Sequence, residues 1–265
     1  MIHFVGAGSG APDLITVRGQ RLLQEADVII YAGSLVNPAL LDVKKADCAV
    51  YNSAHMTLEE VLDVMKEAEA AGKTTVRLQT GDPCLYGAIR EQMDALKQMG
   101  IAYDICPGVS AFCGAAAALE LEYTLPGVSQ TVIISRTAGR TPVPEKESIP
   151  KLAAHQATMV LFLSTGHLPK LQKELIEGGY QENTPAAICY KATWPDEKRF
   201  YCTVGTLAET AEKANITSTA LIVVGNIIGE QYDRSLLYDP SFTTGFREAS
   251  ETVAESEADN ANTNQ

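Results

Sequence analysis

The chain has 265 residues, of which 46% are hydrophobic and 20% are charged, and its formal net charge at pH 7 is −12. This length and composition predict a globular protein with one large or two medium domains and a substantial core. The negative charge argues against nucleic acid as a partner, because phosphates repel an acidic surface. No apolar run approaches the roughly 18 residues of a membrane span, and no secretory signal is visible. We therefore expect a cytoplasmic protein that does not bind a membrane.

The cysteines and histidines give no sign of a metal site. The six cysteines include no C-x-x-C pair, and the four histidines share no ligand spacing with them or with one another. We expect free, mostly buried thiols and no bound metal.

The first nineteen residues set the pattern for the rest of the chain. A short apolar run at residues 2–5 ends in Gly6, Gly8 and Gly10, and a helical pattern then runs from about residue 14 to residue 23. A second strand is predicted at 27–31. A strand, a glycine turn and a helix form a place where bare backbone meets a ligand. The βαβ order predicts a mostly parallel sheet.

This glycine turn has more than one interpretation. Gly6, Gly8 and Ala11 formally satisfy the dinucleotide pattern G-x-G-x-x-G/A. That pattern also needs an acid at the end of the second strand, where this chain has Tyr31 and Ala32, and Pro12 interrupts the expected helix. A tight turn that binds no ligand is the simpler alternative.

The chain after the second strand continues as alternating strands and helices. Thr57 begins a helix, and Glu60 forms a capping box with it. The pattern then predicts strands at 74–78 and 101–106 and helices at 89–100 and 112–119. We expect an N-terminal domain at 1–119, a hinge at 120–129, a C-terminal domain at 130–240 and an acidic disordered tail at 241–265.

The second domain is predicted from apolar runs separated by turn residues. Its expected strands are residues 130–135, 158–163, 185–190, 199–204 and 220–224, and its expected helices are 167–177 and 206–214. Residues 136–150 contain three prolines and three basic residues, a composition too irregular for a regular element.

A second ligand turn follows the strand at 74–78. Its residues Thr80, Gly81, Asp82 and Pro83 allow a flat ligand to approach, and Asp82 can accept hydrogen bonds from a ribose or an amine. The alternative is a type I turn in which Asp82 caps a helix near Tyr86.

Taken together, these turns resemble the tetrapyrrole methylases, S-adenosylmethionine-dependent enzymes of corrin and sirohaem synthesis. Their opening pattern G-x-G-P-G-D-x-x-L-[LI]-T is read here from Gly6 to Thr16, with Ser9 in place of the usual proline and Ala11 in place of a frequent aspartate. The turns at 80–87 and 107–111 follow in the family's order and spacing, and the resemblance covers residues 2–225. Segments 31–36, 86–92, 139–145 and 190–197 are most similar to the branch that methylates C11 of precorrin-4 or cobalt-precorrin-4.

The resemblance implies a fold, a cofactor and a set of contacts. It implies two α/β domains, each with a mainly parallel or mixed sheet, with S-adenosylmethionine held in the cleft between them and S-adenosylhomocysteine as the product. It also implies a homodimer. The cofactor positions carried over are Gly8, Ser9, Gly10, Thr80, Gly81, Asp82, Leu85, Ser110, Ala111, Leu163, Ala192 and Ala220.

The substrate implied by the resemblance is a polycarboxylate macrocycle, which an acidic protein must bind through local cations. Two loops of the second domain contain the basic residues Arg136, Arg140, Lys191, Lys198 and Arg199, and of these Arg136, Arg140 and Lys191 are the candidates for binding the macrocycle. The alternative for each is a solvated surface charge. Ala32 and Ala88 replace an acid and an arginine of the uroporphyrinogen-methylating members, which argues against that substrate.

The expected reaction is in-line methyl transfer, in which positioning matters more than acid–base catalysis. Tyr31, Tyr86 and Glu91 are candidates for orienting the macrocycle or relaying a proton. The alternatives are another precorrin or uroporphyrinogen methylase, an NAD-dependent oxidoreductase and a non-catalytic tetrapyrrole carrier.

Overall fold

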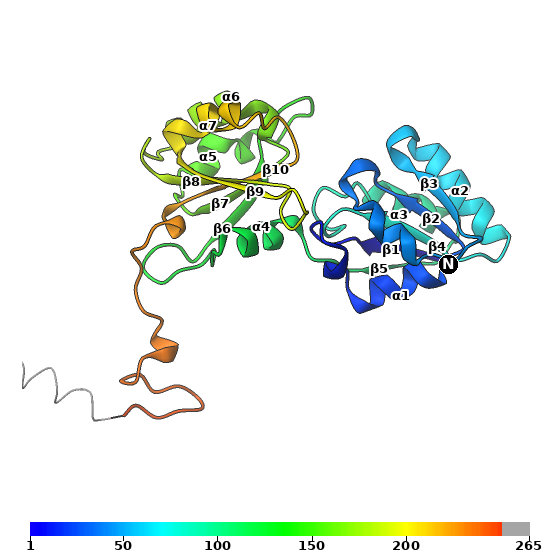
Figure 1. Ribbon diagram of the computed structural model, residues 1–265, viewed down its shortest axis with the longest axis horizontal. Coiled ribbons are helices and arrows are strands. Elements are labelled where there is room, and N and C mark those ends of the chain that lie inside the picture. The colour runs from blue at the N-terminus through cyan, green and yellow to red at the C-terminus, as the bar shows by residue number, and fades with distance from the viewer. Residues whose placement is uncertain (251–265) are drawn as a thin grey trace, which may run out of the picture.

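The computed structural model describes residues 1–250, which form two α/β lobes joined end to end (Figure 1). Each lobe is built on a five-stranded sheet, with strand order β3-β2-β4-β1-β5 in the first lobe and β6-β7-β10-β8-β9 in the second. The expected two-domain α/β architecture is therefore confirmed. Within residues 1–250, no helix has the length and apolar character needed to cross a lipid bilayer.

The first sheet is parallel throughout. Its strands are β1 (Ile2–Gly6), β2 (Val28–Tyr31), β3 (Ala49–Asn52), β4 (Thr75–Gln79) and β5 (Tyr103–Cys106). In register, Ile2 of β1 lies beside Thr75 of β4 and Tyr103 of β5. All five strands thus end at one edge, and in parallel sheets that edge is where ligand-binding turns gather.

Helices cover both faces of this sheet because alternate strand residues point to opposite sides. Leu22 and Leu23 of α1 (Val17–Glu25) are buried in a core with Val76 and Leu78 of β4. On the other face, α2 (Leu58–Ala70) and α3 (Arg90–Gln98) are buried against residues such as Phe4 and Ile30.

The second sheet is mixed. Strands β6 (Val132–Arg136) and β7 (Thr158–Phe162) are parallel, whereas β10 (Ala220–Val224) is antiparallel to both β7 and β8 (Pro185–Tyr190), and β9 (Lys198–Thr203) is antiparallel to β8. One face is covered by α5 (Ile149–Ala153), α6 (Leu168–Glu177) and α7 (Leu207–Lys213).

The opposite face of the second sheet is covered by α4 (Ala111–Leu119), as Figure 1 shows. Ala115, Ala118 and Leu119 of this helix are buried with Val160 and Leu221 of the second sheet. The sequence-based domain limit at residue 119 would separate α4 from the core it helps to form. We propose instead that the boundary lies between β5 and α4.

Two elements differ from the sequence-based prediction. Strand β3 was not predicted, because Val50 and Tyr51 are both more than one-third exposed at the edge of the sheet and give no alternating pattern. Helix α5 begins at Ile149, inside the stretch judged too irregular, with Pro150 in its first turn.

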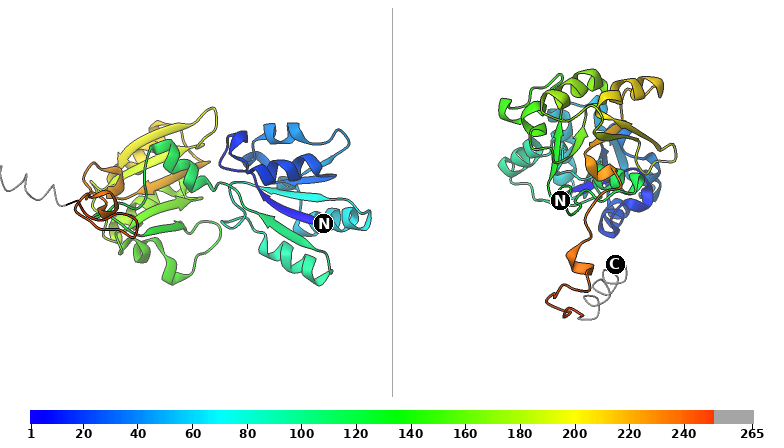
Figure 2. Two further views of the ribbon diagram at one scale, coloured as in Figure 1. Left: turned by 90° about the horizontal axis from the view of Figure 1, so that it is seen from below. Right: turned by 90° about the vertical axis from the view of Figure 1, so that its left-hand side faces the viewer.

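The chain beyond β10 leaves the second lobe on the side away from the first (Figure 2). Residues 241–250 fold back on themselves, and the Ser250 amide donates to the Pro240 carbonyl at 2.9 Å. The predicted acidic tail otherwise lies in residues 251–265, outside the described part of the chain.

The capping box of α2 offers a direct test of the local folding argument. The Glu60 amide donates to the Thr57 hydroxyl at 3.2 Å, and the Thr57 amide donates to the Glu60 carboxylate at 2.7 Å. Thr57→Ala should lower the free energy of unfolding by about 1 kcal/mol in urea denaturation. Glu59→Gln changes a charge in the same turn without touching the cap and should cost less than about 0.5 kcal/mol. Equal effects of the two changes would contradict this assignment.

Candidate functional site

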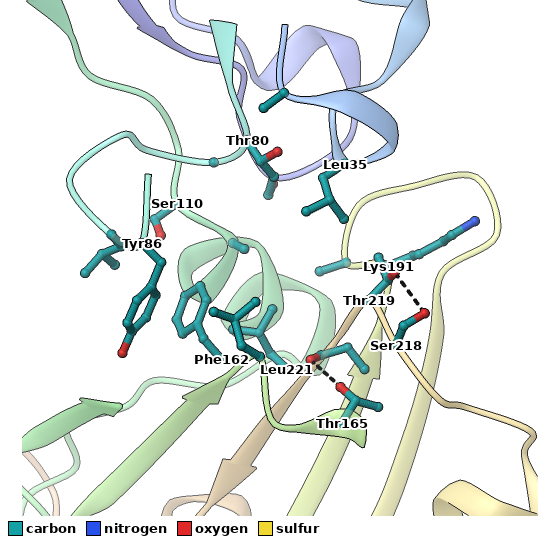
Figure 3. A pocket seen from close by; sticks show the side chains of 18 of the residues that line it. Leu35, Thr80, Tyr86, Ser110, Phe162, Thr165, Lys191, Ser218, Thr219 and Leu221 are labelled. Atoms are coloured by element: carbon teal, nitrogen blue, oxygen red, sulfur yellow. Dashed lines mark hydrogen bonds between the residues drawn. The ribbon is translucent and has the colours of Figure 1, made fainter. Parts of the chain in front are cut away.

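A cavity of about 460 Å³ lies where the carboxyl-terminal turns of the first sheet meet the second lobe (Figure 3). Leu35, Thr80 and Tyr86 reach it from the first lobe, and Phe162, Leu221 and Thr219 from the second. A site of this size between two lobes is typical of small-molecule binding. Among residues 1–250, no group of three or more histidine, cysteine and carboxylate side chains is arranged to hold a metal ion.

Most of the predicted cofactor residues line this cavity. They are Ser9, Thr80, Gly81, Asp82, Leu85, Ser110, Ala111, Leu163, Ala192 and Ala220. The side chain of Leu163 is 65% exposed and its φ is +52°, a left-handed conformation that is unfavourable for leucine. Such strain at a cavity wall is typical of a ligand contact.

Gly8 and Gly10 do not line the cavity, and their positions have other causes. The Gly8 amide donates to the Gly81 carbonyl at 3.2 Å, and the Gly81 amide donates back at 2.9 Å. A Cβ atom at Gly10 would lie 2.2 Å from the ring of Trp194. These glycines therefore allow close approach of the protein to itself, and a cofactor contact at Gly8 or Gly10 stays a prediction.

The turn that carries these glycines forms a joint between the lobes. The Thr193 hydroxyl accepts a hydrogen bond from the Ala11 amide at 3.0 Å and lies 3.0 Å from the Ser9 hydroxyl. The Asn37 side chain donates to the Gly10 carbonyl at 2.9 Å. Thr193 belongs to the loop after β8, so this turn fixes one wall of the cavity against the other.

Asp82 connects two turns of the first lobe. Its carboxylate accepts hydrogen bonds from the amides of Cys84 and Gly108, each at 2.8 Å. Burial opposes ionisation of this group, but the hydrogen bonds from Cys84 and Gly108 outweigh it and hold the pKa of Asp82 below its usual range. Asp82 does not cap a helix near Tyr86, because α3 begins only at Arg90.

Of the three candidate catalytic residues, only Tyr86 reaches the cavity. Its ring lies 5.5 Å from that of Phe162 across the interface between the lobes, and burial raises the pKa of its hydroxyl. Tyr31 packs at the edge of the first core, and its carbonyl accepts a hydrogen bond from Ser53. Glu91 is exposed on α3. Roles for Tyr31 and Glu91 stay predictions that no contact with the cavity supports.

The three candidate substrate cations are in different environments. Arg136 donates to the Thr141 and Pro142 carbonyls at 3.2 and 2.8 Å. Lys191 lines the cavity but lies 2.6 Å from Asp196, whose hydrogen bond raises the pKa of the lysine. Arg140 is exposed and makes no side-chain hydrogen bond or ion pair within residues 1–250. The three candidates therefore differ: the Arg136 guanidinium is held by its own loop, Lys191 is paired with Asp196, and Arg140 has no partner within residues 1–250.

Part of the cavity wall was missed in the sequence. Thr217, Ser218 and Thr219 precede β10, and all three line the cavity. Because β10 runs antiparallel to β7 and β8, its first residue, Ala220, pairs with Tyr190 at the carboxyl end of β8. The sequence does show a run of hydroxyl residues directly before a buried strand. Whether that run lies at the cavity depends on the direction of β10, which the sequence does not reveal.

Comparison with known proteins identifies the family. The model for "Tetrapyrrole (Corrin/Porphyrin) Methylases" matches residues 1–208. The chain belongs to this family. The cobalt-precorrin-4 C(11)-methyltransferase of Methanocaldococcus jannaschii is 53% identical over 94% of this chain and 96% of its own length. The precorrin-4 C(11)-methyltransferase of Pseudomonas aeruginosa is 44% identical over 89% and 94%.

Solved structures agree with this family assignment. The X-ray structure of a cobalt precorrin-4 methyltransferase superposes with a TM-score of 0.85 at 46% identity, covering 86% of this chain and 96% of the other. The uroporphyrin-III C-methyltransferase from Thermus thermophilus, solved in complex with S-adenosyl homocysteine, has a TM-score of 0.73 at 26% identity and covers 86% and 93%.

The contact between Gly10 and Trp194 can be tested without any ligand. Trp194 is the single tryptophan of the chain, so its fluorescence reports directly on this joint. Gly10→Ala places a methyl group where the ring now lies, and the emission maximum should shift to longer wavelength as the indole moves toward water. Gly245→Ala, where an added Cβ meets open space, should leave the spectrum unchanged. Identical spectra for both variants would show that Trp194 does not pack on this turn.

Proposed function

We propose that this protein transfers a methyl group from S-adenosylmethionine to C11 of cobalt-precorrin-4 or precorrin-4, giving the corresponding precorrin-5. The observation that carries the proposal is the match at 53% identity, over nearly the whole of both chains, to a relative named cobalt-precorrin-4 C(11)-methyltransferase. The Pseudomonas relative is named for the metal-free substrate, so the state of the corrin metal is left open.

The cavity suits the proposed cofactor. The hydroxyl oxygen of Thr80 is shielded from solvent and has no hydrogen-bond partner in the described part of the chain, although it lines the cavity. A buried polar atom of this kind is normally satisfied, here by a ligand with polar groups. Leu163, Phe162 and Leu221 supply apolar surface beside it. We assign cofactor binding to those predicted cofactor residues that line the cavity, from Ser9 to Ala220.

S-adenosylmethionine, when bound, supplies a methyl group already activated by its sulfonium. The residues of this chain then have to hold two molecules in line and exclude water. In this proposal the turns at Thr80, Ser110 and Ala192 hold the cofactor, and Tyr86, which also lines the cavity, contacts the flat macrocycle. A strong general base is unnecessary for the transfer itself.

An NAD-dependent oxidoreductase fits the same geometry poorly. A pyrophosphate needs free backbone amides at the glycine turn. Here the Gly8 amide donates to Gly81 and the Ala11 amide donates to Thr193, so two amides of the turn are already used within the protein. A non-catalytic carrier would not need a cofactor cavity beside the surface that binds the macrocycle.

Assembly as a homodimer and a cytoplasmic location stay predictions.

The cofactor assignment predicts a specific calorimetric result. The protein should bind S-adenosylhomocysteine and should not bind NAD(P) at similar concentrations. Thr80→Val should weaken S-adenosylhomocysteine binding by up to about tenfold, because it removes one hydrogen-bonding group. Thr75→Val is the matched control, since its hydroxyl is also buried and unpartnered on β4 but lies outside the cavity lining. Binding of NAD(P) without any binding of S-adenosylhomocysteine would refute the methyltransferase proposal.

The substrate assignment rests on Arg140, the one candidate cation without a partner in the described chain. A hydrogen bond to a charged group is worth roughly 1.5–3 kcal/mol, so Arg140→Ala should weaken tetrapyrrole binding by about 10- to 100-fold. S-adenosylhomocysteine affinity should not change. Lys66→Ala removes a cation on the exposed side of α2 and should behave as the unmodified protein. If the two variants bind the tetrapyrrole equally well, Arg140 is only a surface charge.

A further inference from the structure

The loop that carries Tyr86 is held in an unfavourable conformation. Tyr86 and Ala88 have φ values of +55° and +48°, in the left-handed region that residues with a Cβ atom avoid. Between them, Gly87 lies so close to Pro83 that an added Cβ would be 2.4 Å from the Pro83 carbonyl oxygen. Two strained residues separated by a single glycine persist only where the surroundings determine the conformation.

Two buried glutamines hold this loop by its carbonyl groups. Gln79, at the end of β4, donates from Nε2 to the Gly87 carbonyl at 3.1 Å. Gln92, in the first turn of α3, donates from Nε2 to the Ala88 carbonyl at 2.9 Å. Each glutamine is only 5% exposed, so water does not compete effectively for these bonds. Gln79 lines the cavity, whereas Gln92 does not.

A buried arginine determines which end of the Gln92 amide faces the loop. Arg77, 6% exposed on β4, donates from Nε to the Gln92 Oε1 atom at 3.2 Å and from Nη1 to the Ile30 carbonyl at 3.2 Å. A guanidinium can only donate, so the amide must turn its oxygen toward Arg77 and its NH₂ group toward Ala88.

Arg77 has no carboxylate partner among residues 1–250, although a buried guanidinium is costly. Its burial lowers the pKa to about 10, and no neighbouring charge offsets that effect. An apolar side chain would fill this position in the core at lower cost. The arginine is instead used for its two hydrogen bonds, to Gln92 and to the Ile30 carbonyl.

We propose that Gln92, oriented by Arg77, is a positioning residue that sets the Tyr86–Ala88 loop and thereby places the Tyr86 ring against Phe162 at the cavity wall. The chain of contacts runs from Ile30 through Arg77 and Gln92 to Ala88, entirely within the first lobe. It ends at the Tyr86 ring, which meets Phe162 of the second lobe (Figure 3). The expected effect on activity rests on the proposed methyl transfer. A displaced Tyr86 should misplace the tetrapyrrole and leave the cofactor in place.

The test uses Gln92→Glu, which keeps the shape and the contact with Arg77 but cannot donate to the Ala88 carbonyl when ionised. In hydrogen exchange, the amides of residues 85–89 should exchange about tenfold faster, while those of β1 and β4 keep their rates. With the tetrapyrrole substrate, kcat/KM should fall about tenfold, and the affinity for S-adenosylhomocysteine should stay within twofold. In a Tyr86→Ala background, Gln92→Glu should cause no further loss of kcat/KM, because the residue acts through that ring.

Arg77→Met is the second variant, and it separates positioning from general stability. Replacing the buried guanidinium by an apolar side chain removes the cost of burying a charge but leaves the Gln92 and Ile30 oxygens without this donor, so the two effects on the melting temperature oppose each other. Exchange of residues 85–89 should nevertheless accelerate, because the Gln92 amide is free to rotate. Gln172→Glu is the matched control: Gln172 also bridges backbone groups, the Gly205 carbonyl and the Ala208 amide, in the second lobe away from the cavity. It should leave both kcat/KM and the exchange of residues 85–89 unchanged.

The proposal is overturned if the amides of residues 85–89 exchange at unchanged rates in both Gln92→Glu and Arg77→Met. It is also overturned if adding Gln92→Glu to Tyr86→Ala lowers kcat/KM further than Tyr86→Ala alone. The exchange measurement needs no substrate. If the loop loosens in both variants but the protein methylates no tetrapyrrole, the positioning inference stands and the proposed function fails.

Discussion

The contact of three glycine backbones holds together the edge of the first lobe that faces the cavity. A Cβ atom at Gly6 would lie 2.6 Å from backbone atoms of both Gly108 and Gly81, and one at Gly108 would lie 2.3 Å from the Gly81 oxygen. Gly6 ends β1, and Gly81 and Gly108 follow β4 and β5, which both neighbour β1 in one parallel sheet. Because the turns touch without side chains between them, the strands bring Ser9, Thr80 and Ser110 to one place. The Asp82 carboxylate, bonded to the Gly108 amide, fixes the same contact electrostatically.

The second lobe completes the cavity through contacts on two of its sides. On one side Trp194 lies against Gly10, and Thr193 bonds the glycine turn; on another, Tyr86 crosses to Phe162. Both contacts use residues with left-handed backbones, Thr193 at +68° and Tyr86 at +55°. The two loops therefore carry strain that the contact between the lobes helps to offset. The spacing of the cavity walls depends on these few contacts as well as on the lobes' separate cores.

The sequence was most informative where structure is local. Apolar runs located the buried strands, and β8 and β10 lie at residues 185–190 and 220–224 as expected, because buried strands read as continuous apolar stretches. Thr57 and Glu60 predict the start of a helix, and the structure confirms it. The turns at 80–87 and 107–111 also supply cavity-lining residues that the sequence nominated, among them Thr80, Asp82 and Ser110. Each of these features depends on neighbours within a few positions along the chain.

What the sequence did not reveal depends on contacts between distant residues. Nothing near Gly10 shows that Trp194 packs on it, and nothing near Asp82 shows that it bonds Gly108. The hydroxyl residues at 217–219 reach the cavity only because β10 is antiparallel to its neighbours. Arg77 illustrates the same limit: an arginine within an apolar strand suggests an edge, yet it is buried and bonded to Gln92.

The cations of the second lobe that the sequence nominated for the substrate differ in how far their charge is already paired. Lys191 is paired with Asp196, so its net contribution to the field is small. Arg136 donates to neutral carbonyls, which restrict its motion without cancelling its charge. It lies near enough to favour ionisation of the Tyr86 hydroxyl, an effect that Glu147 opposes. Arg140, four residues further on, adds a second guanidinium to the same loop. We therefore propose that a polycarboxylate macrocycle approaches the Tyr86 side of the cavity. A displaced Tyr86 ring would then change both the surface beneath the macrocycle and its distance from these cations.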